Sequence, residues 1–191
     1  AVYQARDLFR RKLLMSFQGA IGWWFVVSWA ANIGWLLAWH HRLIGVSVLL
    51  MLVLLFSLIR INRRLNARLD PPMMKWDRYL VCWPFSLYFG WITVATIANV
   101  TAFLVSLGWR GDPLSEAFWA VLMILVGALI AASVVRRHRD PVYAAAVIWA
   151  YLGIVIERAR EGGPFGVALA AAICGVALLA LAAAEMIRAR Q

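Results

Sequence analysis

Long apolar runs separated by short polar connectors make up almost the whole chain. The hydrocarbon core of a bilayer, about 30 Å thick, is crossed by a helix of roughly 20 apolar residues. Strands of a membrane barrel would instead alternate in hydropathy over about ten residues, and this alternation is absent. The pattern therefore predicts an all-α, polytopic transmembrane helical bundle with six spans. The expected spans are Ile21–Trp39, Leu43–Ile59, Leu80–Leu107, Ala117–Val135, Val142–Ile156 and Phe165–Ala184.

The composition agrees with a membrane protein. Of the 191 residues, 64% are hydrophobic and 15% are charged, against about 45–50% and about 25% in soluble domains. These values exclude a water-soluble enzyme, a disordered tail and a disulfide-stapled secreted module. The net charge is +10, and the charged residues lie between the apolar runs. This placement indicates a membrane surface rather than nucleic acid as the partner. Cys82 and Cys174 are interpreted as small apolar residues, without a disulfide.

Basic residues are distributed unevenly between the two sides of the expected bundle. With six spans, 15 of the 19 Lys and Arg residues fall on the side that holds both ends of the sequence. The positive-inside rule then places both ends in the cytoplasm, as in a bacterial inner membrane. The chain opens with Ala1-Val2-Tyr3 rather than Met. Because this opening resembles the tail of an apolar segment, our hypothesis is that further helices precede it in the gene product.

Two stretches differ from the other runs and connectors. The connector Arg60–Tyr79 is the longest, and its apolar residues recur at near-helical spacing, which fits a helix among anionic headgroups. A solvated loop with snorkelling arginines explains the connector equally well, and both interpretations stay open. The last run is mostly Gly and Ala, so we expect it to pack closely on a neighbouring helix. The spaced apolar residues of the connector are Leu65, Leu69, Met73 and Trp76.

Residues able to carry catalysis are scarce in the expected spans. The one acidic residue there is Glu185, which we expect to pair with Arg188 on the helix surface. Ion-coupled transporters place ionisable groups in mid-membrane, where the expected spans have no Asp, Glu, Lys or Arg. The sequence also contains no motif of a serine hydrolase, zinc protease or nucleotide-binding protein. We therefore expect no enzymatic activity. A facilitator-type transporter for neutral substrates needs no buried charge and stays an alternative.

His40 and His41 are the candidate metal ligands. They end the first span, where a neutral imidazole can ligate haem iron or a chlorophyll magnesium. The simpler interpretation is that both histidines are polar residues at the membrane interface that end the helix beside Arg42. We therefore expect no metal site.

Tryptophan is the most informative residue type, with 11 in the chain. Several lie near span ends, as in an aromatic belt, and others lie deeper and combine with polar residues into stripes on one helix face. Two such faces opposed would form a cleft for a flat apolar ligand such as a tetrapyrrole, carotenoid or sterol. The alternative interpretation is structural: the polar residues of the stripes form hydrogen bonds between helices, and the aromatic residues fill gaps between them. The first stripe is Ser28, Asn32, Trp35 and Trp39, and the second is Pro84, Tyr88, Trp91, Ala95 and Asn99.

The two stripes resemble motifs of the TspO/MBR family, the tryptophan-rich sensory or translocator proteins. The third expected span reads Tyr88-Phe-Gly-Trp91-Ile-Thr93-Val-Ala95-Thr96-Ile-Ala-Asn99, which matches the family's last-helix pattern Y-x-x-W-x-T-x-A-T-x-x-N at every position. Asn32-x-x-Trp35 resembles the N-x-x-W of the family's third helix. Ser28 and Leu37 stand where the family usually has Gln and Pro. The resemblance covers roughly residues 20–107.

Members of that family are five-helix membrane proteins, often dimers, that bind porphyrins, haem or sterols in a Trp-lined pocket. The resemblance implies a TspO-like core over residues 1–107, with the family's first two helices upstream, and a three-helix extension over residues 108–191. It implies a ligand-binding site at Asn32, Trp35, Trp39, Tyr88, Trp91, Thr93, Ala95 and Asn99.

Two hypotheses of function follow. In the first, the protein is a non-enzymatic membrane protein, often a homodimer in this family, that binds a porphyrin, haem or similar pigment in a sensory or regulatory role. In the second, the chain is an accessory subunit of a photosynthetic or respiratory complex and contacts pigments, lipids or other subunits.

Overall fold

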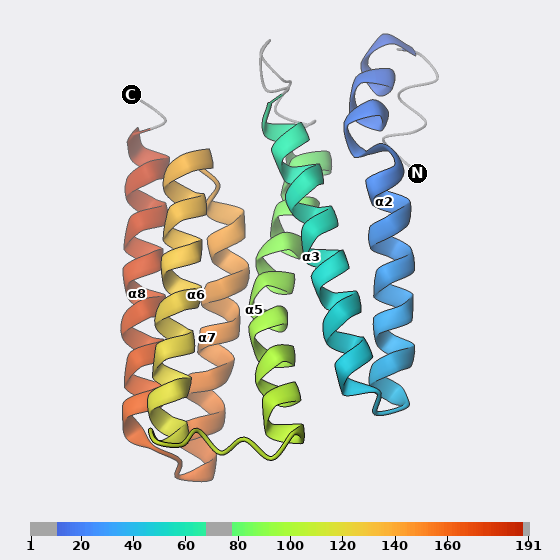
Figure 1. Cartoon of the computed structure of the whole chain (residues 1–191). Coiled ribbons are helices and arrows are strands. Elements are labelled where there is room, and N and C mark those ends of the chain that lie inside the picture. Colours follow the sequence, from blue (N-terminus) through green and yellow to red (C-terminus); the bar gives the residue numbers. More distant parts are fainter. Residues whose placement is uncertain (1–10, 68–77, 189–191) are drawn as a thin grey trace. The chain divides into compact units, whose positions relative to one another are not determined.

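The chain folds into long helices joined by short connections. The structure, a computed structural model, describes residues 11–67 and 78–188, with side chains for 21–67, 78–160 and 162–188. All secondary structure in these residues is helical (Figure 1). The helices are α2 (Arg11–His40), α3 (Ile44–Asn66), the π-helical turn η1 (Arg78–Cys82), α5 (Trp83–Ser106), α6 (Glu116–His138), α7 (Pro141–Glu161) and α8 (Phe165–Arg188).

Six helices of the described residues are long and apolar enough to cross a membrane, which confirms the six predicted spans. The protein is therefore an integral membrane protein whose outer helix faces contact lipid. The fifth span is a full-length helical segment, Pro141–Arg160. In α3, the helix continues to Asn66, beyond the expected end of that span at Ile59. The hypotheses about Ala1–Tyr3 and about the 68–77 part of the long connector lie outside the described residues.

The chain divides into two compact units, unit 1 (Ala1–Phe85) and unit 2 (Ser86–Gln191). Unit 1 contains α2, α3, η1 and the first turn of α5, and unit 2 contains the rest of α5 with α6, α7 and α8. The division at residues 107 and 108 that the family resemblance implied stays a prediction.

Small residues allow α2 and α3 of unit 1 to pack closely along their lengths. Ser28, Ala31 and Ala38 are buried at helical spacing on one face of α2. Beside them, a methyl group at Gly34 would lie 3.3 Å from a methyl carbon of Leu50 in α3. Such small residues let helix backbones approach where no hydrophobic effect drives association. On α3 the buried positions recur every three or four residues at Ser47, Met51, Leu54, Leu58, Ile61 and Leu65.

Helix α2 contains a break near its beginning. Gly22 has φ 44° and ψ −143°, values outside the helical region. Because glycine has no Cβ, it adopts this conformation at low steric cost. The candidate membrane span within α2 is Ile21–His40.

In unit 2, α8 packs against α6 and α7, which confirms the close packing expected for the Gly- and Ala-rich last run. The buried positions of α8 recur every three or four residues. This is the spacing found where right-handed helices pack as in a left-handed coiled coil. Val135 of α6, Ala144 of α7 and Ala182 of α8 form a fully packed cluster among these helices. The buried α8 residues are Val167, Ala171, Cys174, Leu178, Ala182 and Glu185.

A glycine lets α5 and α7 touch in unit 2. A Cβ added at Gly90 would lie 2.6 Å from the carbonyl oxygen of Tyr143 and 3.0 Å from the Cβ of Ala146. The α7 partners are a backbone oxygen and a Cβ, which move only with the helix itself. Glycine at position 90 therefore permits the close approach of these two helices at this point.

We expect Gly90→Ala to destabilise the protein. Overpacking costs about 1–3 kcal/mol, more than the gain of up to about 1 kcal/mol in helix propensity. The melting temperature in detergent should fall by a few degrees. The matched control is Gly153→Ala in α7, where an added Cβ meets no atom within 4 Å. That variant should keep or raise the melting temperature, and equal effects of the two changes would contradict the prediction.

Candidate functional site

Two tryptophans of the first predicted stripe stack on each other in unit 1. The ring centroids of Trp35 and Trp39 are 6.2 Å apart, and their planes differ by 29°. The two residues are one helical turn apart on α2, so their rings share one side of the helix. Asn32, a turn earlier, is partly buried. The structure thus places the rings of Trp35 and Trp39 in contact, with Asn32 on the same side of α2 one turn earlier.

The indole N–H of Trp35 is the unusual group of this surface. Its nitrogen is buried, and it has no hydrogen-bond partner among the described residues. An unpaired donor removed from water costs about 1–3 kcal/mol, and a buried indole N–H usually has a partner. Because this nitrogen has almost no exposed surface, an acceptor on a bound molecule reaches it only after neighbouring side chains move.

The five predicted site residues of α5 lie on more than one side of that helix. Thr93 and Asn99 are buried, whereas the Trp91 side chain is 49% exposed. Tyr88 and Ala95 are partly buried. Positions 91 and 93 are about 200° apart around a helix, so Trp91 and Thr93 cannot face one ligand from the same side. The role of each in ligand binding stays a prediction.

Thr93 belongs to a hydrogen-bonded chain inside unit 2. The hydroxyl of Tyr143, a fully buried residue, donates to Thr93 Oγ1 at 2.8 Å, and the Thr93 hydroxyl donates to the carbonyl of Phe89 at 2.9 Å. The Phe89 and Tyr143 rings pack edge to face with centroids 4.9 Å apart. This contact fastens α5 to α7 and satisfies the hydroxyl groups that lie in the apolar interior.

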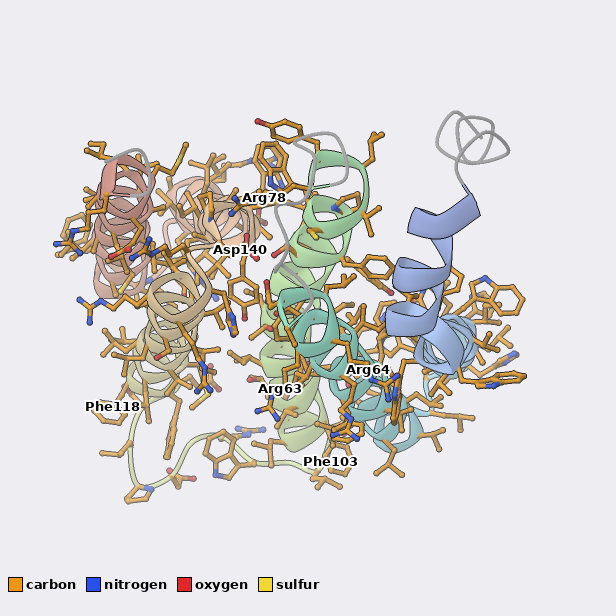
Figure 2. All side chains as sticks on the ribbon, turned by 90° about the horizontal axis from the view of Figure 1, so that it is seen from above. Arg63, Arg64, Arg78, Phe103, Phe118 and Asp140 are labelled. Atoms are coloured by element: carbon orange, nitrogen blue, oxygen red, sulfur yellow. The ribbon has the colours of Figure 1, made fainter. Side chains whose placement is uncertain are left out.

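Asp140 connects the same two helices at their first turns. Its Oδ1 accepts hydrogen bonds from the backbone N–H groups of Val142 at 3.1 Å and Tyr143 at 3.3 Å. Its Oδ2 accepts a hydrogen bond from the hydroxyl of Ser86 in α5. A carboxylate at a helix N-terminus stabilises the unpaired N–H groups and the helix dipole there. Figure 2 marks Asp140 on its ribbon.

A second tyrosine holds α7 to α6. The Tyr151 hydroxyl donates to the carbonyl of Ile124 at 2.6 Å. It lies over Gly127, where an added Cβ would be 2.6 Å from the hydroxyl oxygen. Sequence reasoning missed Tyr143 and Tyr151, although a tyrosine inside an apolar run indicates that its hydroxyl needs a partner.

The remaining candidates for chemistry lie apart from one another. The rings of the exposed His40 and His41 are edge to face with centroids 5.3 Å apart. Among the described residues, no three His, Cys, Asp or Glu side chains come together. Cys174 is a buried free thiol, and Cys82 is partly buried. The predicted pair of Glu185 and Arg188 forms at 2.8 Å, but the carboxylate is buried rather than on the helix surface, because α8 turns this face to its neighbours.

Comparison with known proteins gives the class of the molecule. A protein-family model described as "TSPO-like protein" matches residues 1–184, nearly the whole chain. Searches of curated proteins and of solved structures give no significant match. The fold and the tryptophan- and polar-residue motifs therefore define a polytopic helical membrane protein of the TspO type. The chain belongs to the TSPO-like protein family, and the match extends well beyond the residues 20–107 that carry the sequence resemblance.

The Tyr143–Thr93 bond can be measured by a double-mutant cycle. Tyr143→Phe and Thr93→Val each remove one hydroxyl, and the double variant removes both. Hydrogen bonds between membrane helices are worth on average about 0.6 kcal/mol, with a maximum near 1.7 kcal/mol. We expect a coupling energy in this range from unfolding in mixed micelles. Strictly additive effects would show that the bond does not hold α5 to α7.

Proposed function

We propose that the protein binds a flat hydrophobic ligand of the tetrapyrrole type on the Trp35–Trp39 surface of α2 and performs no catalysis. Membership of the TSPO-like family supports this function. The observation that carries the proposal is the buried, unpartnered indole N–H of Trp35 beside a stacked second indole. A porphyrin combines a planar apolar ring with carboxylate acceptors and so matches both features.

The physical reason for such a ligand lies in the two properties of the surface. Stacked indoles offer a flat apolar area, and offset stacking of aromatic rings contributes about 0.5–1.5 kcal/mol beyond the burial of area. When the side chains that cover it move aside, the N–H of Trp35 fixes the orientation of an acceptor group, as a few placed polar groups do in mostly apolar ligand sites. The partly buried amide of Asn32 supplies a further donor and acceptor within one turn of the helix.

Separately from the α2 surface of unit 1, we propose that Trp91 of unit 2 stacks on a flat ligand. It carries the Trp position of the family motif in α5, and nearly half of its surface is free of protein contact. Tyr88, three residues earlier, lies next to it on the helix surface. Thr93 and Asn99 then shape the helix packing behind these rings rather than reaching the ligand.

The Trp35 assignment is tested by Trp35→Phe. This change keeps an aromatic ring and removes the N–H, so a lost charge-assisted hydrogen bond should weaken protoporphyrin IX binding by about 1.5–3 kcal/mol, roughly tenfold or more. The measurement is the Soret absorbance of porphyrin titrated into the protein in mild detergent. Trp29→Phe is the matched control, because Trp29 is on the same helix and 61% exposed.

An equal, small effect of the Trp35 and Trp29 changes would contradict the proposed hydrogen bond. A wild-type protein without any saturable porphyrin binding would contradict the proposed function itself, and would favour the accessory-subunit hypothesis.

A separate prediction concerns the ring of Trp91. Trp91→Ala should weaken porphyrin binding several-fold while the protein stays folded, because a stacking surface is lost and no buried core residue is removed. Trp149→Ala serves as the control, since Trp149 is 67% exposed on α7, outside the family motif. Unchanged porphyrin affinity in a folded Trp91→Ala protein would remove this residue from the site.

A further inference from the structure

An arginine near the end of α3 in unit 1 lies against two aromatic rings that also contact each other. The guanidinium carbon of Arg60 is 5.5 Å from the ring centroid of Trp24 in α2 and 5.6 Å from that of Phe56 in α3. The two rings themselves pack edge to face, with centroids 5.5 Å apart. Cation–π contacts of this kind contribute about 0.5–2 kcal/mol and restrict the orientation of the guanidinium. Arg60 is therefore held in place although its side chain is exposed.

If the hydrocarbon core begins at Ile44, Arg60 lies about 6 Å inside its far edge, from where an arginine side chain can snorkel to the headgroups. At 1.5 Å per residue, Arg60 lies about 24 Å from the beginning of the helix at Ile44, and a bilayer core is about 30 Å thick. Arg64, one turn further and on the same helix face, reaches the headgroup layer. Figure 2 shows Arg64 with Arg63 at this end of α3. Phosphate groups of lipids lie at this depth.

The local charge balance favours an anion at this point. The sequence contains no Asp or Glu between Arg11 and Ala67, and like charges one turn apart repel each other by about 0.2–0.5 kcal/mol. The negative end of the α3 dipole, equivalent to about half a charge, compensates only part of the three positive charges of Arg60, Arg63 and Arg64. At the end of the helix, the Asn66 side-chain amide donates a hydrogen bond to Asn62 Oδ1 at 2.8 Å.

We propose that Arg60 and Arg64 form a binding site for the phosphate of an anionic phospholipid. A guanidinium binds a phosphate through paired N–H donors. The contacts with Trp24 and Phe56 restrict the Arg60 guanidinium, whose N–H groups would donate to the phosphate. The acyl chains of the same lipid then extend along the apolar surface of α3 below Arg60. This site is independent of the proposed porphyrin site.

The test measures lipid binding to the purified full chain in detergent by native mass spectrometry. The protein is titrated with dioleoylphosphatidylglycerol, with dioleoylphosphatidylcholine as the zwitterionic comparison and with inorganic phosphate as a competitor. We expect tight binding of one phosphatidylglycerol, weaker binding of phosphatidylcholine and no displacement by millimolar phosphate. Equal binding of the two lipids would overturn the proposal. Displacement by phosphate would overturn the lipid assignment in favour of a free-anion site.

Paired variants separate this site from general surface charge. Arg60→Gln with Arg64→Gln should weaken phosphatidylglycerol binding roughly thirtyfold, since each arginine near an anionic surface contributes about fivefold. The control is Arg136→Gln with Arg137→Gln, which removes the same charge from the exposed last turn of α6 and should change the affinity much less. Similar losses in the two double variants would overturn a defined site.

The role of the rings is tested without changing the charge. Trp24→Leu with Phe56→Leu keeps Arg60 and removes both cation–π contacts, so phosphatidylglycerol affinity should fall several-fold. An affinity equal to that of the wild-type protein would overturn the proposed pre-orientation of Arg60.

Discussion

Polar groups placed in hydrocarbon have to find their hydrogen-bond partners inside the protein, and this requirement governs the helices described here. Most hydroxyl groups meet it locally: Ser57, Thr93 and Thr96 each donate to the carbonyl four residues earlier. The larger tyrosines reach across to the next helix, and their bonds determine where α5, α6 and α7 are joined. Against this background of satisfied groups, the unpaired N–H of Trp35 is an exception. An exception of this kind is more informative about function than an aromatic residue that merely faces lipid.

Close helix packing follows from the same apolar surroundings. Since lipid chains are as apolar as the helices, association depends on shape, and the contacts lie where side chains are smallest. Gly90, Gly127 and Gly34 each mark a point where one helix approaches another. Large apolar side chains, including most of the tryptophans, are turned outward instead. The abundance of tryptophan therefore reflects two different positions, a lipid-facing belt and the few indoles that touch other polar or aromatic groups.

The number, order and type of the helices were predictable from hydropathy alone, because the bilayer sets both the length and the composition of a span. Helix ends were less predictable: α3 continues through a charged segment to Asn66, where arginines reach the headgroups without interrupting the helix. The helical repeat correctly grouped Asn32, Trp35 and Trp39. It did not reveal that Thr93 bonds to Tyr143, because that pairing depends on which face of α7 meets α5, and a nearly uniform apolar run contains no signal for this. The contact of Arg60 with Trp24 and Phe56 joins residues of two helices and likewise cannot be read from either helix by itself.

The π-helical turn Arg78–Cys82 before α5 has a consequence for comparing relatives of this protein. Such a turn contains one residue more than an α-helical turn of similar rise. Because one residue corresponds to about 100° around a helix, residues before the turn face about 100° away from the direction they would have in a regular α-helix. A homologue with a regular α-helix here would be one residue shorter and would still present the same α5 surface. Alignments across this helix should therefore admit a one-residue gap within continuous helix, placed before Trp83, so that the motif positions from Tyr88 to Asn99 stay in register.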